Sequence, residues 1–169
     1  MCGACGSGRG PAAWEDVLAG AGPAQRAARA AAAGRLLTGR LLTGRRWRVA
    51  PWRGGYLLAT ATGATRPVAS LDELWAAVGP SSVPSTGEQR WARAQVPAGW
   101  DLQAATVWVA DAARAGTVTA AELPAGGVVE FRDGGAAHVV HPAGPAEVGV
   151  LGPNAGTALA DLLEFARRA

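Results

Sequence analysis

The sequence contains no lysine and no isoleucine, and tyrosine, methionine and asparagine each occur once. Because the missing residues have AT-rich codons, this usage indicates a GC-rich genome, and the choice of arginine over lysine carries no functional meaning by itself. Two cysteines are too few for a disulfide framework. No apolar run approaches the ~18 residues of a membrane span, and the first residues lack the pattern of a secretion signal. We therefore expect a soluble, cytoplasmic protein with no membrane partner.

The composition is that of a folded protein of single-domain size. The chain has 169 residues, of which 49% are hydrophobic and 17% are charged. A chain of this length buries roughly 70% of the surface that its unfolded form exposes. A hydrophobic core can therefore form without disulfides.

The first half of the chain predicts two helices, two strands and a third helix. Pro11 and Pro23 each suit the first turn of a helix, because a backbone N–H at that position has no hydrogen-bond partner within the helix and proline lacks it. An Arg-Gly-Gly turn separates two segments of strand composition. Ser70 and Glu73 have the spacing of a capping box. The predicted elements are helices over 11–18 and 23–37, strands over 47–52 and 56–62, and a helix over 71–78.

The second half repeats this order after a proline- and serine-rich linker, 79–87. Asp101 is a candidate helix cap, and a second XGG turn separates two more strands. The predicted elements are a helix over 101–115, strands over 128–132 and 136–141, and a helix over 154–168. The repeated order has two alternative explanations: an ancient duplication, or coincidence between two small α+β units.

These elements predict an α+β protein. An N-terminal helical hairpin is followed by two ββα-like units, with small antiparallel sheets packed on helices. The sequence divides into a basic part, 1–78, the linker, and an acidic part, 88–169. A single core running through both parts is the alternative.

All four cysteine and histidine residues occur as two closely spaced pairs, Cys2 with Cys5 and His138 with His141. Zinc prefers four nitrogen and sulfur ligands, so these residues predict a zinc site. The Cys-Gly-Ala-Cys-Gly segment resembles one knuckle of the zinc-ribbon family, but the second knuckle is absent and no ribbon fold is implied. Histidines three apart on a strand point to opposite faces, so the site requires a bend before Pro142. One alternative is that the two cysteines alone bind zinc, either within one chain or across a dimer. The other is that both cysteines are free thiols.

Arginine is concentrated in one part of the chain. Residues 17–71 contain nine arginines and no carboxylate, whereas the remainder contains seven arginines and thirteen carboxylates. Codon usage does not explain why the carboxylates avoid this segment. The asymmetry predicts a basic surface.

Alternation in the first predicted strand places Arg46, Arg48 and Trp52 on one face, and Trp47 and Val49 on the other. Arginine beside aromatic residues suits single-stranded nucleic acid, because guanidinium groups pair with phosphates while aromatic rings stack on bases. The candidate residues for binding nucleic acid or another partner are Arg40, Arg45, Arg46, Arg48, Trp52 and Arg53.

The sequence contains no recognisable self-contained catalytic site. Residues 111–122 have the spacing of an EF-hand loop, but Ala113 and Ala115 replace two ligands, and we expect a helix end followed by a capping box from Thr119 to Glu122. We expect a small, non-enzymatic bacterial binding protein, stabilised by zinc, whose surface of arginine and tryptophan engages nucleic acid. The alternative is an adaptor or assembly subunit whose basic face binds an acidic protein or a second copy. A zinc enzyme with an open coordination position is a third class.

Overall fold

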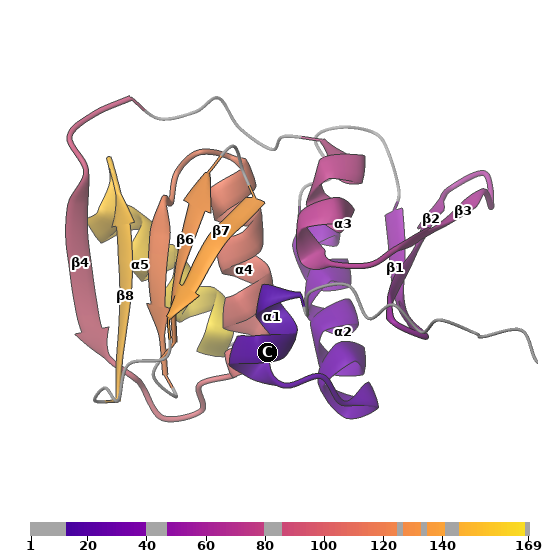
Figure 1. Ribbon diagram of the computed structural model, residues 1–169, viewed down its shortest axis with the longest axis horizontal. Coiled ribbons are helices and arrows are strands. Elements are labelled where there is room, and N and C mark those ends of the chain that lie inside the picture. The colour runs from indigo at the N-terminus through magenta and orange to yellow at the C-terminus, as the bar shows by residue number, and fades with distance from the viewer. Residues whose placement is uncertain are drawn as a thin grey trace, which may run out of the picture.

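The computed structural model describes residues 13–39, 47–79, 86–124, 127–132, 135–140 and 146–167. These residues form five helices and two antiparallel sheets packed on helices, which confirms the predicted α+β class (Figure 1). The helices are α1 (Trp14–Ala19), α2 (Pro23–Gly39), α3 (Leu71–Val78), α4 (Leu102–Arg114) and α5 (Ala155–Arg167). The strands are β1 (Trp47–Trp52), β2 (Gly55–Thr60), β3 (Thr65–Val68), β4 (Arg90–Gln95), β5 (Ala120–Leu123), β6 (Gly127–Arg132), β7 (Gly135–Val140) and β8 (Glu147–Gly152).

The first sheet has the order β1-β2-β3. The predicted Arg-Gly-Gly turn joins β1 to β2, with Trp52 opposite Gly55. Gly54 has φ of 87°, a backbone conformation that favours glycine. A Cβ atom at Gly55 would lie 2.1 Å from the carbonyl oxygen of Val68, so glycine also lets β3 approach. We refer to β1-β2-β3 as the small sheet.

The second sheet has the order β4-β8-β5-β6-β7. The predicted hairpin is β6 and β7, but β8 pairs with β4 and β5 rather than with β7. The strand order therefore differs from that of the first sheet, although both halves place a strand hairpin before a helix. Thr119–Glu122 does not begin a helix: Ala120–Leu123 is a strand, because it pairs with both β6 and β8.

Side-chain caps begin α3 and α4 where the sequence predicts them. Ser70 Oγ accepts a hydrogen bond from the Glu73 amide at 3.2 Å, and Glu73 Oε2 accepts one from the Ala69 amide at 2.8 Å. Asp101 Oδ1 accepts from the Gln103 amide at 2.8 Å. These bonds satisfy amides that have no partner within the first turn of a helix.

One hydrophobic core contains residues from both halves of the chain. Tyr56 and Trp75 of the first half and Val107 and Val150 of the second are all buried in it. Helices α2 and α4 lie side by side between the two sheets (Figure 1). Six residues of the predicted linker, 80–85, lie outside the described residues. No helix in the described part of the chain is long and apolar enough to span a bilayer.

Candidate nucleic-acid interface

The small sheet lies at one end of the molecule, with α2 and α3 on one side of it (Figure 1). Tyr56, Leu58 and Val68 point toward these helices and are buried. Directly paired residues of antiparallel strands share a face. Arg48 pairs with Ala59, which follows the buried Leu58 and so points to the other side of β2. Arg48 therefore lies on the opposite face, which we call the outer face.

The outer face carries the predicted combination of arginine and tryptophan. Arg48 is exposed, while its neighbours Trp47 and Val49 pack against the core, as the alternation predicts. Trp52 lies on the same face and 54% of its surface is exposed. Arg53 follows it in the turn and is also exposed. The structure thus brings together three of the predicted partner-binding residues.

These guanidinium groups have no carboxylate partner within the described part of the chain. Neither Arg48 nor Arg53 makes an ion pair with a described residue, and the same holds for the exposed Arg66 of β3. The sequence from 47 to 70 contains no acidic residue. The other three predicted residues, Arg40, Arg45 and Arg46, lie outside the described residues.

Two arginines of the basic segment do not contribute to this surface, because both are paired with the carboxylate of Asp16. Arg26 Nη2 lies 2.8 Å from Asp16 Oδ2, and Arg29 Nη2 is hydrogen-bonded to Asp16 Oδ1. Arg29 is fully buried. It also donates to Tyr56 Oη at 2.8 Å and to Gln103 Oε1 at 3.0 Å. The sequence offers no clear signal for this network beyond the alanine-rich surroundings of Arg29.

A second group of arginine and tryptophan lies on β4, at the far edge of the second sheet. The guanidinium carbon of Arg93 lies 4.6 Å from the centre of the Trp91 ring. Unlike Arg48, however, Arg93 pairs with Glu122 at 3.1 Å, and Arg90 pairs with Glu88 at 2.5 Å. This second group is therefore locally neutralised.

Three of the four predicted zinc ligands, Cys2, Cys5 and His141, lie outside the described residues. His138 belongs to β7, where its backbone is paired with that of Glu130. Within the described ranges no three cysteine, histidine or acidic side chains are grouped as metal ligands. The EF-hand-like segment ends in β5 rather than forming a calcium loop, and its Glu122 pairs with Arg93.

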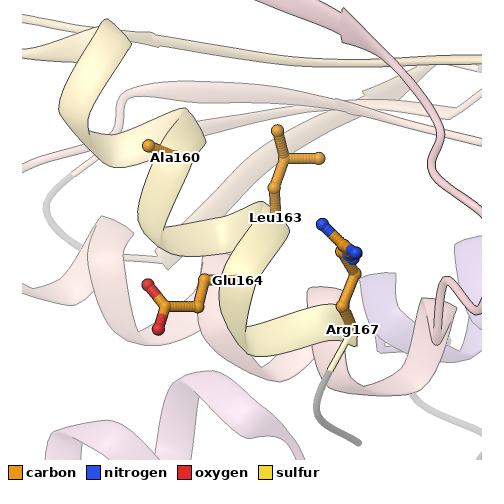
Figure 2. A pocket seen from close by; sticks show the side chains of 4 residues that line it. All are labelled: Ala160, Leu163, Glu164 and Arg167. Atoms are coloured by element: carbon orange, nitrogen blue, oxygen red, sulfur yellow. The ribbon is translucent and has the colours of Figure 1, made fainter.

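A pocket beside α5 is lined by Ala160, Leu163, Glu164 and Arg167 (Figure 2). In that view Leu163 and Arg167 point to one side of the helix and Glu164 points to the other. This lining contains no histidine, cysteine or hydroxyl group. Its polar groups are the Glu164 carboxylate and the Arg167 guanidinium.

Comparison of the chain with protein-family models, with curated proteins and with solved structures finds no match.

Proposed function

We propose that the protein binds single-stranded nucleic acid on the outer face of the small sheet. The observation that carries this proposal is the exposed Trp52 beside Arg48 and Arg53, on a face without carboxylates. An exposed indole stacks on any base, and removal of such a stack typically costs about 1–3 kcal/mol per base. Guanidinium groups pair with phosphates.

The spacing on β1 suits an oligonucleotide better than a mononucleotide. Arg48 and Trp52 lie on one face of the strand, and four residues of a strand span ~13 Å. A phosphate at Arg48 and a base stacked on Trp52 therefore belong to different nucleotides of one strand. Arg66 on β3 pairs with Leu58, so it lies on the opposite face of the small sheet and is not counted among these contacts.

A titration of labelled single-stranded DNA and RNA, followed by fluorescence anisotropy, tests the proposal. Two phosphate contacts, at Arg48 and Arg53, predict a roughly 7-fold loss of affinity between about 50 mM and about 200 mM salt. Absence of binding at the lower salt concentration would contradict the proposal.

The double variant Arg48→Gln, Arg53→Gln locates the surface. Its matched control is Arg90→Gln, Arg93→Gln, which removes the same charge where each arginine already has a carboxylate partner. We expect the first variant to bind at least tenfold more weakly and to have a reduced salt dependence. An equal loss in both variants would mean that net charge, rather than this face, attracts the nucleic acid.

An adaptor that uses the same basic face is the rival function. Positive charge attracts an acidic protein as well as a nucleic acid, but the exposed ring of Trp52 favours nucleic acid because it can stack on bases. Polyglutamate as a competitor separates the two cases. If polyglutamate binds and oligonucleotides do not at low salt, the partner is an acidic protein or a second copy of the chain, and sedimentation then decides whether the protein self-associates.

The proposal includes one zinc ion bound by Cys2, Cys5, His138 and His141, and its support is the pairing and residue chemistry in the sequence. Native mass spectrometry of protein prepared with zinc, before and after a chelator, tests it. We expect one zinc per chain, lost on chelation. An unchanged apo mass would contradict this part and leave the nucleic-acid proposal standing.

A further inference from the structure

Glu15 is a buried acid with an incomplete set of hydrogen bonds. It belongs to α1, and only 1% of its surface is exposed. Its Oε1 atom accepts a hydrogen bond from the amide of Leu71, the first residue of α3, at 2.7 Å. Its Oε2 atom is buried without a hydrogen-bond partner in the described structure. A carboxylate in such a place retains little of the solvation that water would provide.

The nearest cation does not compensate the Glu15 carboxyl. The guanidinium of Arg29 on α2 is already bonded to Asp16 of α1, Tyr56 of β2 and Gln103 of α4. It reaches Glu15 only at the backbone carbonyl oxygen, at 3.2 Å. Its charge acts on the Glu15 carboxyl from a distance, without a direct hydrogen bond.

A second acid faces Glu15 from α3. Asp72 Oδ1 accepts from Trp14 Nε1 at 3.1 Å, and Asp72 Oδ2 accepts from the Ala136 amide at 3.1 Å. The negative charge of Asp72 opposes ionisation of Glu15. Glu15 would therefore ionise beside an existing negative charge.

These surroundings favour the neutral form of Glu15. The pKa of Glu15 is raised from 4.5 to about 7: burial is the largest cause and Asp72 also raises it, whereas the backbone amides of Leu71 and of Glu15 itself, and the charge of Arg29, lower it. Glu15 therefore holds its proton to higher pH in the folded protein than an exposed glutamic acid does.

We propose that the Glu15 carboxyl is a pH-sensitive latch that holds α1 against the beginning of α3 while it is protonated and loosens α1 when it ionises. Helix α1 has only six residues, too few to persist without tertiary contacts. Helix α1 also contacts α3 through the Trp14 bond to Asp72, β6 through an edge-to-face contact between Trp14 and Phe131 with ring centres 5.4 Å apart, and α2 through the Asp16 ion pairs. Once Glu15 leaves its buried position, these contacts lose the helix that positions them. The inference does not depend on nucleic-acid binding.

Hydrogen exchange of the full-length protein tests the latch. Exchange rates are corrected for intrinsic base catalysis and compared at about pH 5.5 and about pH 8.5. With an ordinary acid in the open state and a pKa of about 7 in the closed state, the opening equilibrium of α1 should rise about 30-fold between these conditions. Amides of α4 are the internal reference and should not follow this change.

The variant Glu15→Gln keeps the shape and the hydrogen-bond acceptor but cannot ionise. We expect its α1 protection to be independent of pH. The matched control is Glu73→Gln, because Glu73 also accepts a backbone amide at the start of α3 but is exposed; its pH response should equal that of the unaltered protein. If Glu15→Gln does not fold, the test rests on the unaltered protein, in which equal α1 protection at both pH values would overturn the latch. If Glu15→Gln folds, a pH response equal to that of the unaltered protein would also overturn it.

Discussion

Arg29 and Arg48 belong to the same carboxylate-free segment, yet they occupy opposite environments. Arg29 is fully buried and donates hydrogen bonds to side chains from α1, β2 and α4. Arg48 is exposed on the small sheet and has no ion-pair partner in the described part of the chain. One basic segment thus supplies both a polar centre inside the protein and a charged surface outside it. A run of like charge in a sequence does not by itself define a surface.

The β4 group adds a third environment to this comparison. Arg93 has an aromatic neighbour, as Arg48 has a nearby Trp52 on its strand, but Glu122 offsets its charge. The two groups thus share residue types but differ in whether a carboxylate pairs with the arginine. The absence of a local carboxylate is what distinguishes the small sheet.

The variant Arg29→Met should have the largest effect on stability. It removes the donor for several buried acceptors and leaves Asp16 without its buried partner. Loss of one member of a buried pair typically costs about 3–5 kcal/mol. Urea unfolding measures the change. The control Arg48→Met should change the free energy of unfolding by less than about 0.5 kcal/mol, and equal effects of the two substitutions would erase the contrast between the two environments.

The variant Glu15→Gln should alter how global stability depends on pH. The folded state raises the pKa of Glu15 from 4.5 to about 7, so between these values the folded protein binds more protons than the unfolded one. The contribution of Glu15 to stability is therefore present below about pH 4.5 and is lost as pH rises to about 7, by about 3 kcal/mol in total. Chemical unfolding across this range should show a fall in the unaltered protein that the Glu15→Gln variant lacks. Parallel curves would contradict this assignment.

The variants Trp52→Ala and Trp91→Ala compare the two exposed tryptophans, which are 54% and 39% exposed. Removal of Trp52 should weaken oligonucleotide binding by about tenfold, which corresponds to 1.4 kcal/mol within the range for a base stack. Trp91 lies against the paired Arg93, so its removal should leave affinity unchanged. Anisotropy titration at low salt measures both, and a larger loss for Trp91 would move the binding surface to β4.

The variant Arg93→Gln should have the smallest effect. Arg93 and Glu122 are 48% and 19% exposed at their side chains, and pairs in contact with water contribute about 0–1 kcal/mol. A double-mutant cycle with Glu122→Gln isolates the pair. A coupling energy well above this range would show that the β4 group is a structural element comparable with Arg29.

Local sequence signals predicted the elements whose chemistry lies within a few residues. The Ser70 and Asp101 caps, the Arg53-Gly54-Gly55 turn and the alternation around Arg48 are all present. Strands β3, β4, β5 and β8 were not predicted, because their partners, rather than their composition, hold them in place. In β8, for example, Gly149 weakens the strand pattern, but the side chains of Trp91 and Arg93 cover it from the neighbouring strand.

The candidate site was predicted in part for the same reason. Alternation along β1 is a property of any strand, so it identified which residues share a face with Arg48. The sequence predicted that the first two helices form a hairpin, but not which of their side chains meet, so the pairing of Arg26 and Arg29 with Asp16 could not be inferred.

The sequence alone determined the segregation of charge and the order of the locally encoded elements, because both depend on residue type and short spacing. The tertiary structure decided which arginines face water and which acid is buried. Those outcomes depend on distant parts of the chain: Arg29 meets Gln103 across 74 residues, and Glu15 meets Leu71 across 56. Solvation and charge pairing are set by such neighbours, so these properties exist only in the folded protein.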